Sequence, residues 1–464
     1  MDTTLADASA AELRAAYADG STDPVAVLDA VKARVEACEP TINALWHTDF
    51  AAARQAAEAS AARWQAVEPL SNLDGVPVTI KENIAWAGVG MPGGHNAGEP
   101  TVAEANAPIT DRLLEAGAVL FASTVMPDWG MLSSGVSSRH GITRSPLNPE
   151  LTTGGSSSGA GAAAAAGYGP IHIGSDIGGS IRLPGTWLGL ATLKPSFGRV
   201  PLSAPYLGRC AGPLARRMSD VIDAMEVIGR PDDRDYSQLP ATADSYRDED
   251  FDVTGLRVAV HTDAGCGSAT DPEVAAAVDA AAAVLESAGA RVEQITPFMD
   301  QELLVDIDRF WRVRSWADFK ALDDADRRRI LPYVAQWCWA GADISATELL
   351  RCYHSIQEMR RRTVEATAGY DFVLSPVAPM AAFPADWPMP FNDATQPMQH
   401  ISFTVPYNMS EQPASSVPAG YTADGRTIGL QVAGRRFDDR GVLSLSEWFE
   451  SALHVPTASR TVGV

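Results

Sequence analysis

The chain has 464 residues, of which 46% are hydrophobic, 20% charged and 7% aromatic, and this ordinary globular composition excludes a disordered or fibrous protein. Acidic residues outnumber basic ones by 58 to 36, which gives a formal net charge of −22. Such a surface repels phosphate backbones and anionic membranes, so we expect no nucleic-acid partner and no membrane association.

The first third of the chain predicts helices that lead into short strands. Residues 9–18 predict a first helix, and Asp23 followed by Pro24 is typical of a second helix start, with an end near Cys38, before Pro40. Further predictions are an Ala-rich helix over 49–64, a strand over 76–80, a helix end over 111–116 and a strand over 118–123.

Gly, Ser and Ala dominate residues 151–198, which contain only short apolar segments at 171–173 and 190–193. Small side chains let the backbone approach another backbone segment or a ligand closely. Packing of Ala-rich helices is the alternative explanation for this composition.

The last half of the chain alternates between strands and helices, which is typical of an α/β layered fold. No linker-like run or repeat of fixed period divides the chain, so we predict one large domain, although length alone suggests roughly three. The predicted strands cover residues 256–261, 291–295, 371–377 and 427–432. The predicted helices cover residues 271–287, 301–320, 325–338, 346–367 and 441–453.

The five cysteines form no close pairs, and none of the eight histidines has a metal-binding spacing. We therefore expect reduced cysteines and no metal, as in a cytoplasmic protein. The first seven residues are acidic and lack an apolar core, so they do not predict a signal peptide. The longest weakly charged stretch, 151–175, is too rich in Gly and Ser for a membrane span.

Two glycine patterns match known motifs but lack the context that those motifs need. Gly88 to Gly93 fits a dinucleotide-binding pattern, yet Pro92 makes a poor helix start. Gly155 to Gly159 fits a nucleophile elbow centred on Ser157, yet no apolar strand precedes it. We therefore set both motifs aside.

Lysine is rare in this chain, with four residues against 32 arginines. Lys81 directly follows the apolar strand predicted over 76–80. Partial desolvation there would lower the pKa of the ammonium and make the neutral amine accessible, which arginine does not allow. The alternative is a structural ion pair with Glu82 or Asp74.

A glycine pair precedes Ser180 in the segment Asp176 to Arg182, just after the predicted strand at 171–173. Two glycines ahead of a serine can turn several backbone N–H groups toward one point, as an oxyanion hole requires. Asp176 and Arg182 flank the segment and could brace it as an ion pair. A plain tight turn is the alternative.

Together these segments resemble the amidase signature family. The resemblance rests on residues 75–83, 153–159 and 176–184, on the spacing between Ser156 and Ser180, and on residues 189–201, 403–408 and 429–435. It implies one domain over 1–464 with a mixed, twisted sheet covered by helices on both faces. Within that domain we expect N-terminal helices over 1–70, a catalytic core over 71–210, and the rest of the core with pocket and lid loops over 211–464.

The resemblance also implies the roles of individual residues. Ser180 would be the nucleophile, Ser156 a bridging serine after a cis peptide bond, and Lys81 the base. The oxyanion hole would consist of the backbone N–H groups of Ile177, Gly178, Gly179 and Ser180.

Three features depart from the family pattern. Ser158 stands where most relatives have a second Gly. The sequence of residues 130–136 also differs from the one common in the family, so the resemblance does not identify the substrate. By position, Gly130 and Met131 are candidate substrate-binding residues. Residues 387–400 look like an insertion, either a lid or a simple surface loop.

The resemblance implies a serine amidohydrolase that cleaves the C–N bond of small amides or carbamates (urethanes) through an acyl- or carbamoyl-enzyme, without metal or cofactor. The apolar, Met-rich sequence near the expected pocket favours neutral, apolar substrates. We expect a monomer or homodimer whose only partner is a small-molecule amide or carbamate. The alternatives are the glutamine-hydrolysing subunit of a tRNA-dependent amidotransferase, which the net charge disfavours, and a non-catalytic binding protein.

Overall fold

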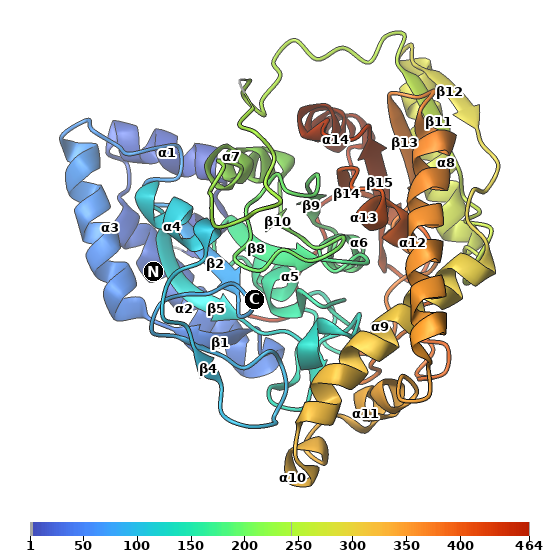
Figure 1. Ribbon diagram of the computed structural model, residues 1–464. Helices are drawn as coiled ribbons and strands as arrows, with labels where there is room; N and C mark the ends of the chain where they lie inside the picture. The colour runs from blue at the N-terminus through green and yellow to red at the C-terminus, as the bar shows by residue number, and fades with distance from the viewer. Residues whose placement is uncertain (1–2, 243, 464) are drawn as a thin grey trace.

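A single mixed β-sheet of 11 strands runs through the molecule in the computed structural model, which describes residues 3–242 and 244–463 (Figure 1). The strand order is β1-β5-β2-β8-β10-β9-β14-β15-β13-β11-β12. β2 pairs in parallel with β5 and β8, and β11 with β12 and β13, whereas the remaining neighbours are antiparallel. The predicted mixed sheet is therefore confirmed.

The strands of this sheet are short and mostly buried. They are β1 (Leu45–Thr48), β2 (Pro77–Lys81), β5 (Val119–Thr124), β8 (Ile171–Asp176), β9 (Ala191–Lys194), β10 (Cys210–Ala215), β11 (Arg257–Val260), β12 (Arg291–Gln294), β13 (Phe372–Pro376), β14 (Ala414–Tyr421) and β15 (Thr427–Gly434). Two small hairpins lie outside it, β3 (Gly90–Met91) with β4 (Thr101–Val102), and β6 (Val136–Ser137) with β7 (Gly141–Ile142).

Helices account for most of the remaining regular structure. They are α1 (Ala10–Asp19), α2 (Pro24–Ile42), α3 (Phe50–Gln65), α4 (Pro108–Glu115), α5 (Ser158–Ala166), α6 (Arg182–Leu188), α7 (Met218–Ile228), α8 (Pro272–Ser287), α9 (Gln301–Ala321), α10 (Asp324–Arg327), α11 (Pro332–Trp339), α12 (Ala346–Thr367), α13 (Val405–Met409) and α14 (Asp439–Leu453), with short 3₁₀ turns η1 (Thr3–Asp7) and η2 (Asp128–Gly130).

Two predicted helix boundaries are wrong, and both involve proline. α2 continues past Pro40 to Ile42, because a proline in the last turn removes only one hydrogen bond and Asn43 then ends the helix in a left-handed conformation. The helix predicted over 325–338 is two helices, α10 and α11. Pro332 starts the second of them, since its fixed φ suits the first helical position.

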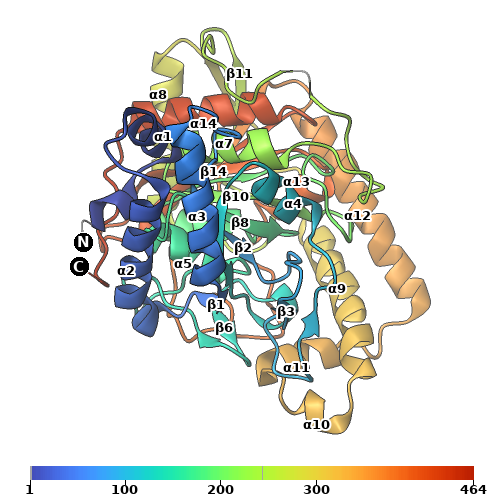
Figure 2. The same ribbon diagram turned by 90° about the vertical axis from the view of Figure 1, so that its left-hand side faces the viewer.

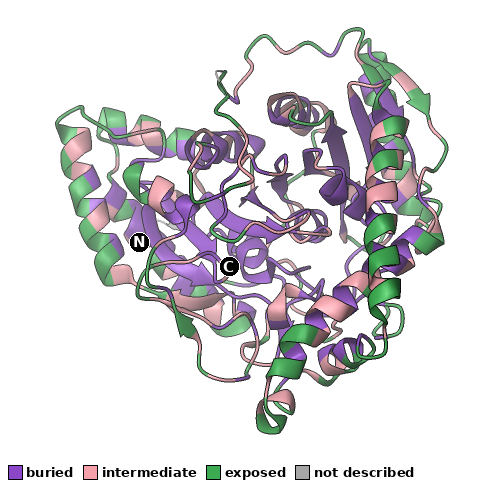
Figure 3. Ribbon diagram, in the orientation of Figure 1, coloured by how far each residue is buried: buried purple, intermediate pink, exposed green. Residues whose placement is uncertain are grey.

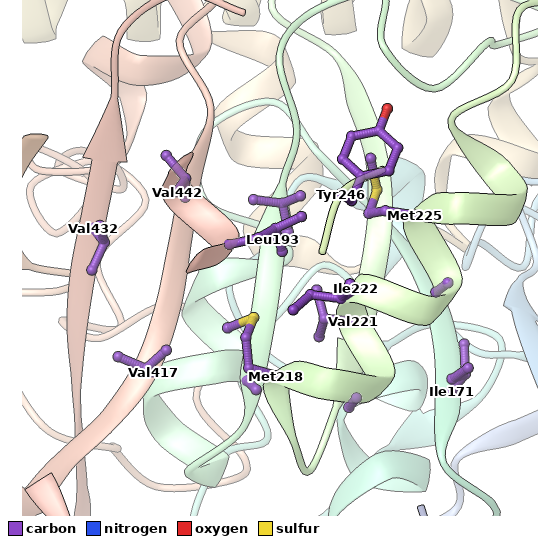
Figure 4. Close-up of a cluster of buried hydrophobic side chains, with 14 of the residues drawn as sticks. Ile171, Leu193, Met218, Val221, Ile222, Met225, Tyr246, Val417, Val432 and Val442 are labelled. Atoms are coloured by element: carbon purple, nitrogen blue, oxygen red, sulfur yellow. The ribbon is translucent and has the colours of Figure 1, made fainter. Parts of the chain in front are cut away.

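Helices cover both faces of the sheet. On one face α4, α7, α8 and α14 pack on apolar side chains from the sheet, and Figure 4 shows part of this cluster around Met218, Ile222 and Val432. On the other face α3 and α5 pack against β5, and α2 packs on α3 and contacts β2. α5 is so rich in Ala and Gly that it lies close to the strands.

A second apolar cluster lies beside the sheet, where α9, α11 and α12 form a helical layer (Figures 1 and 2). The outward faces of α9 and α12 are exposed, whereas their inward faces are buried (Figure 3). Among the residues that the structure describes, no helix is both long enough and apolar enough to cross a membrane.

Candidate active site

Lys81 is the last residue of β2, the third strand in the order of the sheet, and is fully buried. Its Nζ donates hydrogen bonds to the hydroxyls of Ser156 at 2.8 Å, Ser157 at 3.1 Å and Ser175 at 3.2 Å. Strand alternation turns the side chain of the next residue, Glu82, away from these serines. The lysine therefore sits among hydroxyl groups.

The alternative prediction of an ion pair between Lys81 and a neighbouring carboxylate is wrong. Glu82 lies 2.9 Å from Nε2 of His140, and Asp74 accepts two hydrogen bonds from Arg63. Neither carboxylate is therefore bonded to the lysine.

Burial lowers the pKa of Lys81 from 10.5 to about 7. The positive charge of Arg209 lowers this pKa further, whereas Glu82 and Asp176 raise it. Desolvation penalises the ammonium more than the amine, and hydroxyl neighbours compensate for only part of that cost. The neutral amine is therefore well populated near neutral pH.

Ser156 lies in the loop that leads into α5. The peptide bond between Gly155 and Ser156 is cis. A side chain at Gly155 would place its Cβ 2.4 Å from the carbonyl oxygen of Ser134, so only glycine fits there. Ser157 follows as the residue before α5, after a loop rather than a strand, which agrees with setting the elbow motif aside.

Ser180 is half-buried in the loop between β8 and α6. This loop and the Ser156 loop are joined by a hydrogen bond from the Ser157 N–H to the Ser180 carbonyl oxygen at 3.2 Å. Among the described residues the Ser180 hydroxyl has no hydrogen-bond partner, which leaves it free to face the pocket.

Asp176 and Arg182 form a fully buried ion pair at 3.0 Å that braces the Ser180 loop. Burial alone would raise the pKa of Asp176, but the charge and hydrogen bonds of Arg182 hold it well below its usual range. Arg182 also bonds three groups far along the chain, namely Asn408 Oδ1 at 2.6 Å, Gln431 Oε1 at 2.8 Å and the Thr404 carbonyl oxygen at 3.0 Å.

The same carboxylate corrects one expectation about the oxyanion hole. The Gly179 N–H donates to Asp176 at 2.8 Å, so it is already occupied, and the N–H of Ile181 is held at 3.1 Å in the same way. The N–H groups of Ile177, Gly178 and Ser180 have no acceptor in the described part of the chain. These three remain as candidate donors.

A pocket opens at Ser180 and is lined mainly by apolar and aromatic side chains. Its walls include both predicted substrate-binding residues. The lining residues are Trp129, Gly130, Met131, Leu132, Ser133, Ile177, Gly178, Ser180, Leu183, Trp311, Arg314, Trp337, Met398 and Ile401. A larger cavity of about 780 Å³ near Glu450 and Arg460 contains none of the predicted catalytic residues.

Residues 387–400 form part of the pocket wall. Met389 is buried and its Sδ accepts from the Ser133 N–H at 3.3 Å, while Nε2 of His400 lies 2.8 Å from the Ser133 hydroxyl. Burial lowers the pKa of His400 to about 3, so the ring stays neutral at ordinary pH. Through Ser133 this segment contacts the loop that also contains Gly130 and Met131.

The described residues contain no cluster of three His, Cys, Asp or Glu side chains that could hold a metal ion, and all five cysteines are free. The pattern at Gly88 to Gly93 lies in a turn and the short strand β3 and does not open a helix. Around Ser180 the structure presents serine hydroxyls, a buried amine and backbone N–H groups.

Comparisons with known proteins agree on one family. The sequence model of the Amidase family matches residues 26–443. The chain is 33% identical to an acylamidase of Rhodococcus erythropolis, with 96% of this chain and 95% of the relative aligned. The chain belongs to the amidase signature family. Members of this family hydrolyse amides, so this amidase is an amide-hydrolysing enzyme.

Other relatives of this amidase differ in what they do. It is 31% identical to a glutamyl-tRNA(Gln) amidotransferase subunit of a Synechococcus species over 91% of both chains. Among solved structures it resembles a bacterial aryl acylamidase, with a TM-score of 0.87, 25% identity and 96% of each chain covered. A 6-aminohexanoate cyclic dimer hydrolase, with a TM-score of 0.86 over 99% of both chains, shares the fold at 24% identity.

Sequence analysis missed several residues of the amidase site. Ser175 contacts Lys81 and also accepts from Asn83 Nδ2 at 3.1 Å. A serine in the strand just before Asp176 was the only signal for it. Trp311 and Trp337 come from α9 and α11, and no sequence pattern links these helices to Ser180.

Proposed function

We propose that this amidase hydrolyses small amides and carbamates at Ser180, with Ser156 and Lys81 as a proton relay. The observation that supports this best is the hydrogen bond of 2.8 Å between Lys81 Nζ and the Ser156 hydroxyl, in a dry site beside the Ser180 loop. A serine hydroxyl is a weak nucleophile until a neighbouring base accepts its proton.

The reaction begins with neutral Lys81, which accepts a proton from Ser156 while Ser156 accepts one from Ser180. Ser180 Oγ bonds to the carbonyl carbon, and the new oxyanion is stabilised by the N–H groups of Ile177, Gly178 and Ser180. Collapse of this intermediate breaks the C–N bond, and the relay returns the proton to the leaving amine. Water then releases the acyl or carbamoyl group by the same steps. Hydrogen bonds of such relays often tighten only when substrate is bound.

The pocket favours substrates with an apolar or aromatic group. Trp129, Trp311 and Trp337 supply large flat surfaces, and Met131 and Met398 add flexible apolar side chains to the lining. The solved structure with 25% identity is an aryl acylamidase, and the curated relative with 33% identity is an acylamidase. We therefore infer that aryl and alkyl amides are preferred substrates and that uncharged carbamates are also accepted.

A second candidate function is glutamine hydrolysis within an amidotransferase, because the relative that is 31% identical is a component of such an enzyme. An apolar pocket offers few groups to hold the ammonium of glutamine. Release of ammonia from glutamine, together with a stable complex with a second protein chain, would favour this alternative over the first.

The test begins with a fluorophosphonate probe, intact mass measurement and mapping of the modified peptide. We expect one adduct on Ser180 in the wild type and none in Ser180→Ala. Ser158→Ala is a matched control, because Ser158 begins α5 two residues after Ser156 but its hydroxyl donates to the Val125 carbonyl oxygen, so labelling should persist. An adduct on Ser157 would contradict the proposed nucleophile. A panel of anilides and carbamates then tests turnover.

A further inference from the structure

One charged side chain interrupts the apolar pocket wall. Arg314 lies on α9 one turn after Trp311, and both residues line the pocket that contains Ser180. Residues three apart on a helix share a face, so the guanidinium points the same way as the indole. It is half-exposed and lies 5.1 Å from the ring centroid of Tyr206.

Arg314 differs from its neighbours on the same helix in having no carboxylate partner. Arg309 pairs with Asp306 at 3.6 Å, and Arg312 pairs with Asp308 at 2.7 Å. Arg314 forms neither an ion pair nor a hydrogen bond with any described residue, although Asp318 is only one turn away. Most arginines of this acidic chain do have such a partner, so the empty side of Arg314 is a specific feature of the pocket.

A second guanidinium lies within electrostatic range of the first. Burial lowers the pKa of Arg209, and the positive charge of Arg314 lowers it further. Among the described residues, the Arg209 guanidinium bonds only the Ala204 carbonyl oxygen, at 3.4 Å, and pairs with no carboxylate. The two like charges repel each other, and an anion bound near Arg314 would offset part of that repulsion.

We propose that Arg314 is a specificity-determining residue that binds a carboxylate on the substrate, so that this amidase prefers amides carrying an acidic group on the part that projects from Ser180 toward α9. This inference rests on the proposed function. A guanidinium fits a carboxylate with two parallel hydrogen bonds, and the apolar walls around it strengthen the attraction. A local positive site also offsets the repulsion of an anionic substrate by the net charge of −22.

The test compares substrates that differ only in that charge. One pair is an N-aryl succinamic acid and its methyl ester, with the group on the acyl side, and the other is 4-acetamidobenzoate and its methyl ester, with the group on the amine side. In one of the two pairs we expect the wild type to favour the acid in kcat/KM by about tenfold, mainly through KM, with a preference that falls as salt is added.

Substitutions at Arg314 should change that ratio. Arg314→Gln should remove the preference, Arg314→Lys should retain part of it, and Arg314→Glu should favour the ester. Arg309→Gln is the matched control on the same helix, because its side chain pairs with Asp306 and is absent from the pocket lining, so the ratio should stay that of the wild type.

The failure of this inference differs from the failure of the proposed function. If the esters are hydrolysed through Ser180 but neither acid is preferred, or if Arg314→Gln keeps the ratio, the inference is overturned and the function stands. If no amide is hydrolysed, the inference is tested by measuring how tightly the two acids bind. Calorimetry with Ser180→Ala should detect binding of at least one of the two acids, and this binding should be lost in the Ser180→Ala, Arg314→Gln double variant. Equal binding by both proteins would overturn the inference.

Discussion

The protonation of Lys81 should set how activity depends on pH. A lysine in water has a pKa near 10.5, whereas burial lowers the pKa of Lys81 to about 7. At pH 7 this shift raises the neutral fraction by roughly a thousandfold or more. Lys81 acts as a base only in its neutral form, so activity should be low at acidic pH and should rise with pH. About one tenth of the plateau is expected at pH 6 and about nine tenths at pH 8.

The assay is kcat/KM for an uncharged chromogenic anilide from pH 5 to 10 at constant ionic strength. Lys81→Arg keeps the charge but does not act as a base near neutral pH, so it should lose about 10² to 10⁴ in rate. Lys320→Ala removes an exposed lysine on α9 and should leave the profile unchanged. A midpoint near pH 10, a flat profile, or an active Lys81→Arg variant would refute the reasoning.

Removing the carboxylate of Glu82 tests whether charge near Lys81 sets the pH profile in the expected direction. Its negative charge favours the ammonium and raises the pKa of Lys81. Glu82→Gln should therefore move the midpoint of the activity profile to lower pH. A shift to higher pH would mean that Glu82 acts on Lys81 by some route other than charge.

Three further predictions concern the structure around the site. Asp176→Asn should cost about 3–5 kcal/mol in the free energy of unfolding, measured with urea, because it leaves the Arg182 charge buried without its partner; a cost below about 1 kcal/mol would contradict the network. Gly155→Ala should lower kcat by about a hundredfold or more, because its Cβ would meet the Ser134 carbonyl oxygen and displace the loop; an active variant would show that the loop adapts. Tyr407→Phe should keep or raise stability by up to about 1 kcal/mol in thermal unfolding, because the buried hydroxyl has no hydrogen-bond partner among the described residues; a clear loss would indicate a bound water.

The regular elements with strong local signals could be predicted from the sequence. Asp23 caps α2, and Ser9 starts α1 with a capping box, both as the residue types indicate. β10 and β14 were missed, since their serines, glycines and prolines give no apolar alternation. β10 pairs with β8 and β9, and β14 pairs with β9 as well as with the adjacent β15. Local sequence does not encode the pairing with strands elsewhere in the chain.

The candidate site could be predicted only as far as its motifs extend. Lys81, Ser156 and Ser180 stand in recognisable segments, and the structure brings their loops together. The Gly179 N–H was expected to be free, and only the fold reveals that Asp176 occupies it. Arg314 could not be found at all, because an unpaired arginine looks like any other arginine in a helix until its neighbours are known.

The contacts of Arg182 also bear on how the enzyme is made. The loop that carries Ser180 belongs to the first half of the chain, yet its bracing requires Asn408 and Gln431, which leave the ribosome close to the end of synthesis. A nascent chain that has not reached Thr404 has Asp176 as the only one of these partners for the Arg182 guanidinium. Because domains generally fold as units, we expect activity only after nearly all of the chain has been translated. We therefore expect fragments that end before β15 to be inactive, because they lack Gln431, and we expect a second fragment that supplies β15 to restore activity.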